Sequence, residues 1–301
     1  MKDIKGYIEK KFNFNEFIFN DDTNIEGVKN YFYNAKADAI YCYNTISKYL
    51  TRDKKILEVG GGIHLLTNFL DENYQITSVE PGGFIGLTDE LRNQILKDKK
   101  IDVHKTTLEN FDSSNKFDFI FSMNVLEHTK DISLHIESCI KLLKDENSIL
   151  FVQCPNYSFP FEPHFYEFFI PFFPKLTFKK IKKKKLIKRL GEKAYNKIFD
   201  NLNFECNYKN IKKLDFNINF KHPVKEIFTR LTKDTQFKNR ILDNYFVKII
   251  YKIIIFCKLE KIICFIFPKS ISPYLTFEIK NAIIKNKKKG CKIAAFFKIF
   301  G

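Results

Sequence analysis

The chain has 301 residues, of which 45% are hydrophobic and 16% aromatic, so it can bury a substantial core and is not intrinsically disordered. Its formal net charge is +16, which favours a polyanion or an anionic membrane leaflet as partner. The seven cysteines form no C-x-x-C pair and no histidine stands at metal-ligand spacing, so we expect reduced thiols and no metal site. The opening residues MKDIKGYIEKKF carry both charge signs and no apolar segment, which predicts a cytoplasmic protein without a secretory signal.

The first fifty residues are predicted to be helical. Ile25 to Leu50 carries apolar residues at helical spacing, and Thr51 to Asp53 makes a short break before the next element.

A glycine-rich turn follows in Ile56 to Leu70, which reads ILEVGGGIHLLTNFL. The pattern predicts a buried strand, a tight turn at Gly60, Gly61 and Gly62, and the start of a helix. Glycine permits close approaches that a Cβ would forbid, and the helix start directs unpaired N–H groups toward whatever lies over the turn. Such turns serve cofactors and ordinary packing alike, so the turn by itself leaves both interpretations open.

Gln75 to Glu80 predicts a second strand that ends in an acid, 18 positions beyond Gly62. This separation is typical of a carboxylate that binds ribose hydroxyls in nicotinamide and adenosyl cofactors. A dinucleotide site would have a third glycine where this chain has Leu65, which argues against a pyrophosphate and so against a nicotinamide oxidoreductase.

Three later apolar segments predict further strands, at Ile101 to Lys105, Phe117 to Ser122 and Ser148 to Gln153. They alternate with predicted helices at Asp89 to Lys99 and Asp131 to Lys144. Strands alternating with helices indicate an α/β fold with a doubly wound, mostly parallel sheet and a ligand at the carboxyl ends of the strands.

Glu58 to Gly62, Glu80 and the segment Phe117 to His128 (FDFIFSMNVLEH) together resemble the class I, Rossmann-like S-adenosylmethionine-dependent methyltransferases. The resemblance covers Thr51 to Asn156, about a third of the chain. It implies a seven-stranded sheet and S-adenosylmethionine as cofactor. The expected division is cap helices in 1–50, a cofactor-binding core in 51–156, and a helical, aromatic and basic elaboration on the substrate side in 157–301.

The resemblance also implies roles for the residues of the turn. Glu58 would orient the turn and reach the methionine amino group, Gly60 to Gly62 would make room for the methionine moiety, and Glu80 would bind the ribose. The family often has a further alternate glycine where this chain has His64, which leaves the contact to the methionine carboxylate open.

Other positions are assigned by the same resemblance. Leu108 and Glu109 would contact adenine, and Ser122, Met123 and Asn124 would close the cofactor cleft from the fourth strand. Helices before the first strand cover the cleft in this family, and three tyrosines there are candidates either for ligand contact or for core packing: Tyr31, Tyr33 and Tyr43.

Two histidines are candidate catalytic residues. His128 lies at the substrate edge in the family, where it either orients groups or transfers a proton. His164 follows the fifth strand in a loop that receives the acceptor in the family, and a neutral imidazole there could take a hydroxyl proton or simply anchor the loop. Glu162 and Glu167 flank His164 and could orient or replace it.

The elaboration carries membrane-like features. Phe159 to Phe178 is aromatic, and Lys179 to Arg189 (KKIKKKKLIKR) is basic with an apolar side, so the pair predicts either an anionic membrane contact or a solvated helix. Tyr245 to Phe267 approaches membrane-span length but carries five charges, which favours an interfacial hairpin or a cover of the substrate site over a spanning helix.

Later segments are expected to return to the sheet. Ala194 to Phe220 predicts a helix followed by short strands, and Ser272 to Lys280 predicts a late strand at the sheet edge. The tail Asn281 to Gly301 is basic with an apolar finish, which again suits a membrane surface.

These features predict a peripheral-membrane methyltransferase that acts on a hydroxyl of a glycan or lipid-linked glycan, by resemblance to enzymes that accompany bacterial surface-polysaccharide synthesis. The alternatives are a quinone or lipid methyltransferase, and a nucleic-acid-binding protein or RNA methyltransferase that uses the basic run on phosphates. The run lacks the aromatic interleaving of a base-stacking surface, which disfavours nucleic acid. The oligomeric state stays open.

Overall fold

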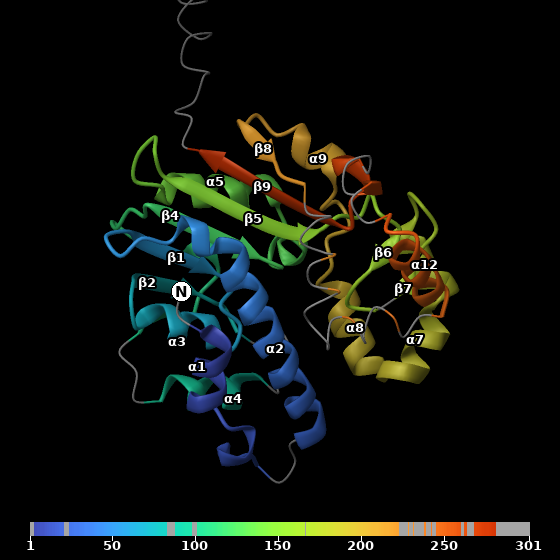
Figure 1. Cartoon of the computed structure of the whole chain (residues 1–301), viewed down its shortest axis with the longest axis horizontal. Helices are drawn as coiled ribbons and strands as arrows, with labels where there is room; N and C mark the ends of the chain where they lie inside the picture. The colour runs from blue at the N-terminus through green and yellow to red at the C-terminus, as the bar shows by residue number, and fades with distance from the viewer. Residues whose placement is uncertain are drawn as a thin grey trace, which may run out of the picture.

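A computed structural model describes residues 3–20, 24–82, 88–97, 101–165, 167–222, 245–259, 262–263 and 268–280, with positions 228, 231, 238 and 242. Its centre is a seven-stranded sheet with helices packed on its faces (Figure 1). In sheet order the strands are β3 (Asp102–His104), β2 (Gln75–Val79), β1 (Lys55–Val59), β4 (Phe119–Met123), β5 (Ile149–Pro155), β9 (Tyr274–Lys280) and β8 (Ile218–Phe220). The strands from β3 to β5 are parallel and β9 is antiparallel to both its neighbours, which confirms the predicted mostly parallel sheet.

The late strand was expected at the sheet edge, and this expectation is wrong. β9 lies between β5 and β8, and the short β8 forms the edge. The burial of β9 explains its place, because its residues from Leu275 to Ile279 are buried on both faces of the sheet. A strand buried in this way needs a partner along each side as well as cover above and below.

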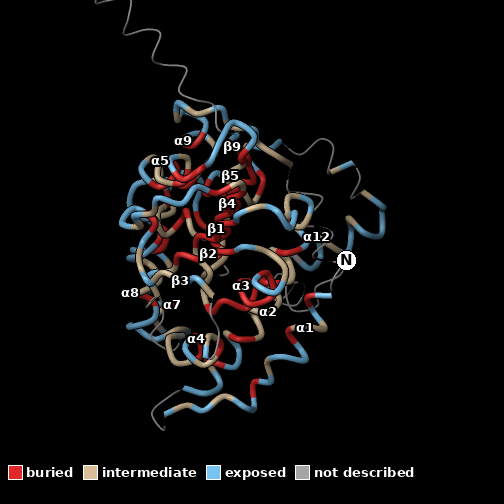
Figure 2. Tube along the Cα trace, turned by 90° about the vertical axis from the view of Figure 1, so that its left-hand side faces the viewer, coloured by how far each residue is buried: buried red, intermediate tan, exposed pale blue. Residues whose placement is uncertain are grey.

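Alternate residues of β1 face two separate parts of the core. Ile56 packs in the cluster that contains α2 and α3, whereas Leu57 packs in the cluster that contains α5. Buried segments accordingly gather along the central strands in Figure 2. The register pairs Val59 with Val79 on one side and with Ser122 on the other, so the carboxyl ends of β1, β2 and β4 meet at one point.

Helices that precede β1, and helices between the strands, cover the two faces of the sheet. Helix α2 begins after Asn24, whose side chain accepts from the N–H of Gly27, and a 3₁₀ turn continues it to Tyr49. The helical elements are α1 (Ile4–Lys11), η1 (Phe14–Glu16), α2 (Ile25–Ile46), η2 (Ser47–Tyr49), α3 (Leu65–Asp71), α4 (Thr88–Leu96), η3 (Leu108–Asn110), η4 (Leu126–His128) and α5 (Ile132–Leu142).

The elaboration forms a lobe beside the carboxyl end of the sheet (Figure 1). The lobe contains the hairpin β6 (Phe161–Glu162) and β7 (Glu167–Phe168), then α6 (Pro174–Leu176), the π-helix η5 (Thr177–Ile181), α7 (Lys183–Leu190), α8 (Glu192–Asp200) and α12 (Tyr245–Phe256). Helix α9 (Tyr208–Lys212) instead lies beside β8, and η6 (Lys269–Ile271) contacts it (Figure 1). Phe165, Phe178 and Tyr195 of the lobe belong to the same buried cluster as Leu57 of β1. The lobe is therefore continuous with the core of the sheet.

No helix within the described part of the chain is both long and apolar enough to cross a bilayer. The predicted hairpin at Tyr245 to Phe267 is described only as α12 and a few positions beyond it. The basic tail 281–301 lies outside the described residues.

Candidate active site

The carboxylate of Glu80 lies against the glycine turn. Its Oε2 accepts from the N–H of Gly62 at 3.0 Å, and its Oε1 accepts from the N–H of Gly82 at 2.8 Å. Glu80 directly follows β2, so the sheet places it beside the turn that follows β1. A half-buried carboxylate is thereby held at the carboxyl ends of adjacent parallel strands, where ligands of such sheets bind.

Two glycines of the turn are required for different reasons. Gly60 has a φ of 83°, and a Cβ on it would lie 2.2 Å from Cγ2 of Val125. Gly62 has a φ of 57°, but a Cβ there would meet only the hydroxyl of Tyr31, at 3.8 Å. Gly60 thus allows β4 and η4 to approach the turn, whereas Gly62 is required for its positive φ and not for lack of room.

Tyr31 therefore borders the turn while its ring packs against the N-terminal core cluster, and its contact with a ligand stays a prediction. Burial raises its pKa to about 12, with a further contribution from the charge of Glu80, so its hydroxyl is neutral and can donate. Tyr43 instead packs its ring edge-on against Phe69 in the core, at 4.9 Å between centroids. Tyr33 lies among the rings of Phe14 and Phe32.

Glu58 supports the turn from beneath. Its buried carboxylate accepts from the hydroxyl of Thr67 and, at 3.1 Å, from the hydroxyl of Ser78. Burial raises its pKa to about 7 against the opposing effect of these two hydrogen bonds. Because both hydroxyls belong to the core, the structure gives Glu58 a supporting place, and its reach to a methionine amino group stays a prediction. The glycine-turn motif in the sequence did not identify Thr67 or Ser78 as the hydrogen-bond donors to Glu58.

His64 stands where the family often has a further glycine. It adopts the left-handed conformation, with a φ of 61°, so it preserves the backbone that a glycine would give. Its Nδ1 lies 3.0 Å from the hydroxyl of Thr67, and burial lowers its pKa to about 4, which keeps the ring neutral. Since Thr67 donates to Glu58, the Nδ1–H of His64 donates to Thr67.

Residues at the end of β4 bring polar atoms next to the end of β1, where the glycine turn begins. The Oγ of Ser122 and the Oδ1 of Asn124 are buried and have no hydrogen-bond partner among the described residues. Asn124 also has a φ of 56°, while Met123 packs in the core. Buried polar atoms in native proteins are nearly always hydrogen-bonded, so these two atoms suit a polar ligand.

The predicted adenine residues occupy separate environments. Leu108 is buried in the core, and Glu109 accepts from Nδ1 of His135 in α5 at 2.7 Å. This hydrogen bond lowers the pKa of Glu109 to about 2. The structure thus ties Glu109 to α5, and the adenine contact stays a prediction.

The structure brings His128 and His164 together, which sequence spacing did not reveal. Their ring centroids lie 5.0 Å apart at an interplanar angle of 73°. The Nδ1 of His128 is 3.1 Å from the carbonyl oxygen of Asn201, and the Nδ1 of His164 is 2.7 Å from Oε1 of Glu162. Burial, followed by the charge of His164, lowers the pKa of His128 to about 4.

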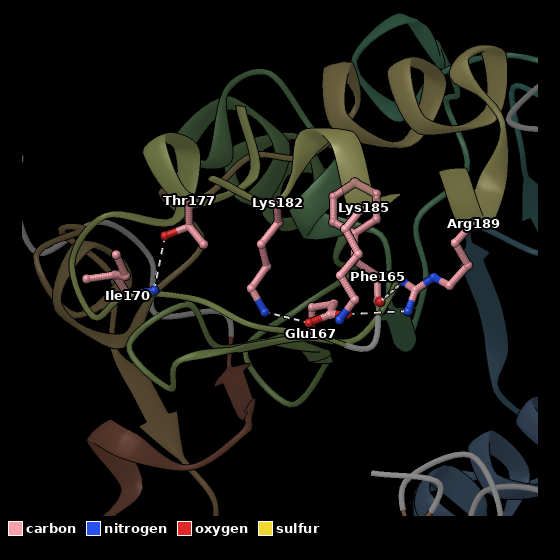
Figure 3. A network of polar contacts seen from close by, with 7 residues as sticks. All are labelled: Phe165, Glu167, Ile170, Thr177, Lys182, Lys185 and Arg189. Carbon is pink, nitrogen blue, oxygen red and sulfur yellow. Dashed lines mark hydrogen bonds and ion pairs between the residues drawn. The ribbon is translucent and has the colours of Figure 1, made fainter. Parts of the chain in front are cut away.

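Glu162 orients His164 as predicted, whereas the same expectation for Glu167 is wrong. Glu167 instead binds the basic helix: Lys182 and Lys185 donate to it at 2.5 and 2.6 Å, and Arg189 lies at 3.5 Å (Figure 3). The β6–β7 hairpin sets the two glutamates opposite each other, but Glu162 is held by Tyr157 and His164 whereas Glu167 meets the lysines of the basic run. Burial alone would raise the pKa of Glu167, but the hydrogen bonds from the lysines lower it below its usual value.

The basic run therefore has two kinds of residues. Lys182, Lys185 and Arg189 hold the hairpin, and Arg189 also donates to the carbonyl oxygen of Phe165 (Figure 3). Other cations of the run are exposed, namely Lys179, Lys180, Lys183, Lys184 and Lys188.

An exposed apolar surface lies directly before and within this run. We call it the apolar lip, and it consists of Ile170, Phe172, Phe173, Leu176 and Ile181. Phe172 is 93% exposed, which is unusual for so large an apolar side chain. Helix α12, on the same lobe in Figure 1, adds further exposed residues: Ile249, Ile250, Ile253 and Phe256.

Comparison with known proteins shows that a family model matches more than half of the chain. The model of a family described as "Methyltransferase domain" matches residues 31–209, from within α2 to α9. An uncharacterized protein of Mycobacterium tuberculosis is 35% identical over 136 residues, which cover 43% of this chain and 46% of the relative. A ubiquinone biosynthesis O-methyltransferase of Nitrobacter winogradskyi is 31% identical over 91 residues, covering 30% of this chain and 34% of the relative.

The chain thus spans less than half of the length of these relatives. Among solved structures, an S-adenosylmethionine-dependent methyltransferase from Clostridium acetobutylicum is 17% identical, with a TM-score of 0.34 over 41% of this chain and 52% of that one. DesVI of Streptomyces venezuelae is 15% identical, with a TM-score of 0.37 over 46% of this chain and 60% of that one.

Proposed function

The chain belongs to the methyltransferase domain family, and we propose that it transfers the methyl group of S-adenosylmethionine to a hydroxyl of a glycan or lipid-linked glycan at a membrane surface. One observation carries the cofactor half of this proposal. Glu80 accepts a hydrogen bond from the N–H of Gly62, so an acid that can bind ribose hydroxyls lies beside the glycine turn at the carboxyl ends of β1 and β2.

The residues around the turn fit S-adenosylmethionine. Glu80 would hold the ribose, the turn at Gly60 to Gly62 would take the methionine part, and Ser122 and Asn124 have buried polar atoms for it to satisfy. Tyr31 would cover the ligand with a neutral hydroxyl. The cofactor supplies a sulfonium methyl that is already activated, so the chain's own contribution is to position the acceptor and exclude water.

Calorimetry with S-adenosylmethionine and S-adenosylhomocysteine tests the cofactor site. We expect Glu80→Ala to weaken both ligands about 10- to 100-fold, because hydrogen bonds to a charged group contribute roughly 1.5 to 3 kcal/mol. The matched control is Glu146→Ala, an exposed acid in the turn before the amino end of β5. Wild-type protein that binds neither ligand, or a Glu80→Ala variant that binds both as tightly, would refute the assignment.

The apolar lip and the exposed lysines support the membrane half of the proposal. Aromatic side chains insert at the boundary of a bilayer, and each basic residue near an anionic surface contributes about 1 kcal/mol. Phe172 and Phe173 lie seven or more positions before the exposed Lys180, Lys183 and Lys184, on the same lobe that carries His164. A membrane bound there would bring a lipid-linked acceptor close to the histidine pair.

Co-sedimentation with anionic liposomes tests this surface. Replacing Lys183, Lys184 and Lys188 by Gln removes three exposed charges and should weaken binding about 100-fold, at roughly 1 kcal/mol per charge. Replacing the exposed Lys10, Lys11 and Lys29 by Gln makes the same change of charge on the N-terminal helices, and we expect little effect. Equal losses in the two triple variants would show that only net charge matters and would remove the lip from the proposal.

A second candidate acceptor is a quinone or another lipid. The relative from Nitrobacter winogradskyi, named as a ubiquinone biosynthesis O-methyltransferase, favours it. Both acceptors can be tested with radiolabelled S-adenosylmethionine and a membrane extract. Label recovered on an O-methyl sugar after acid hydrolysis supports the glycan, whereas label on an aromatic ring in the organic phase supports the quinone.

A further inference from the structure

Glu127, His128 and His164 form a cluster that the proposed function leaves unexplained. Glu127 and His128 lie in η4, and His164 lies between β6 and β7. One potential ligand atom from each lies within 4.8 Å of the others. Both histidine side chains are about one-fifth exposed, so the cluster can be reached from outside.

Glu127 is the decisive member of this cluster. Its side chain is fully buried, and neither of its carboxylate oxygens has a hydrogen-bond partner within the part of the chain that the structure describes. A buried carboxylate without a partner is strongly unfavourable unless it neutralises or coordinates a cation. Its position beside two imidazoles favours coordination.

Each imidazole is oriented through its other ring nitrogen. The Nδ1–H of His128 donates to the carbonyl oxygen of Asn201, and the Nδ1–H of His164 donates to Glu162, so Nε2 of each ring carries the lone pair. Nε2 of His128 lies 3.9 Å from Oε1 of Glu127. Metal-binding histidines are held in this way, by a backbone carbonyl or a carboxylate on the nitrogen that does not bind the metal.

Glu162 itself is rigidly placed. Its carboxylate is fully buried and also accepts from the hydroxyl of Tyr157 at 3.2 Å and from the N–H of Phe165 at 2.5 Å. The ring of His164 is thus fixed through a carboxylate that is held by three hydrogen bonds.

We infer that Glu127, His128 and His164 bind one divalent transition-metal ion of the Zn²⁺ type, which would hold the acceptor hydroxyl. Two imidazole nitrogens and one carboxylate oxygen are a donor set of catalytic zinc sites, which keep a further position for water or substrate. Val125, two positions before Glu127, packs against Gly60, so η4 lies next to the cofactor turn.

This inference rests on the proposed methyl transfer and changes the role of the histidines in it. A metal ion lowers the pKa of a bound hydroxyl, so the acceptor loses its proton to water without a side-chain base. The acceptor oxygen then forms a bond to the methyl carbon, while the bond from that carbon to sulfur breaks and its electron pair stays on sulfur. His128 and His164 hold the ion and do not take the proton.

Metal titration of the chelator-treated full chain tests the site. We expect one equivalent of Zn²⁺ by calorimetry, and one equivalent of Co²⁺ with the visible d–d absorption of a protein-bound ion of low coordination number. His128→Ala, His164→Ala and Glu127→Gln should each weaken binding by more than 100-fold, and Glu162→Gln by about 10- to 100-fold as a supporting residue. The control is His104→Ala, which removes an exposed histidine that pairs with Asp102.

Parallel titration with S-adenosylhomocysteine separates this inference from the proposed function. Wild-type protein that binds S-adenosylhomocysteine but no Co²⁺, or alanine variants that bind Co²⁺ as tightly as wild type, would overturn the metal site alone. Metal binding that depends on the three residues would support the site even if S-adenosylhomocysteine did not bind. Should an alanine variant fail to fold by circular dichroism, Glu127→Gln decides, because it keeps the shape of the side chain.

Discussion

We call the glycine turn with Glu80 the cofactor end, and the cluster of Glu127, His128 and His164 the acceptor end. The two regions are built on different principles. The cofactor end is centred on one short stretch, residues 58–82, whose contacts run between neighbouring parallel strands, and Tyr31, Ser122 and Asn124 border it. The acceptor end uses side chains from η4 and the β6–β7 hairpin, together with the carbonyl oxygen of Asn201 at the end of α8. The first end therefore depends on backbone conformation, whereas the second depends on how separate elements pack.

The largest expected effect comes from a substitution that disturbs the backbone of the glycine turn. In Gly60→Ala the new Cβ would strike Val125, and the positive φ adds strain, so we expect a loss of about 3 to 5 kcal/mol of unfolding free energy and no cofactor binding. Gly62→Ala has room for its Cβ and should lose only about 1 to 2 kcal/mol. Urea unfolding measures both, and Val125→Ala combined with Gly60→Ala should recover part of the loss.

Protonation of Glu58 gives the next effect. Its folded pKa is about 7 and its usual value is 4.5, so the folded state binds more protons between these values and stability falls as pH rises through this window. The fall amounts to roughly 3 kcal/mol. Urea unfolding of wild type and Glu58→Gln from pH 4 to 8 should show this slope weakened in the variant, while Glu146→Gln keeps it. Parallel curves for wild type and Glu58→Gln would contradict the assignment.

A smaller effect concerns the support of the acceptor end. Lys182→Met removes one ion pair to the mostly buried Glu167 and should lower stability by about 1 kcal/mol, since Lys185 remains as a partner. Lys183→Met changes an exposed neighbour in the same helix and should stay within about 0.5 kcal/mol of wild type. Thermal unfolding of the two variants compares them, and equal melting temperatures would mean that the hairpin does not depend on this pair.

The smallest expected effect tests whether Tyr31 contacts the cofactor. Tyr31→Phe removes only a hydroxyl near Gly62, so we expect cofactor binding to weaken a few-fold, about 1 kcal/mol or less, with no change in melting temperature. Tyr33→Phe, in the aromatic cluster of the N-terminal helices, should leave binding unchanged. If both variants bind the cofactor as tightly as wild type, Tyr31 packs in the core and does not contact the ligand.

The cofactor end could be predicted because its signals are local. Strand periodicity, the glycine turn and the acid after the second strand lie within one stretch, and each has a direct physical meaning. The strands and α2 accordingly appear close to their predicted bounds. His64 preserves the left-handed backbone of the glycine it stands for, which the residue type alone did not indicate.

The acceptor end could be predicted only in part, because its contacts are long-range. The pairing of His128 with His164 depends on the path of the chain after β5. The misplacement of Glu167 arose from sequence proximity, since its ion pairs are with Lys182 and Lys185, which lie 15 and 18 positions later in the chain. The edge position expected for β9 was wrong for a similar reason: the sequence predicted short strands before Phe220 and a late strand at Ser272 to Lys280, but not which of them would lie outermost.

The interior position of β9 also governs how the protein folds during synthesis. The ribosome releases β5 more than one hundred residues before β9 emerges, so β5 has an unpaired edge throughout that interval. Open edges of this kind template aggregation, and nascent chains of this size commonly rely on chaperones. Closure of the central sheet is consequently a late event in synthesis, and a chain that stops before β9 would keep an unpaired edge on β5.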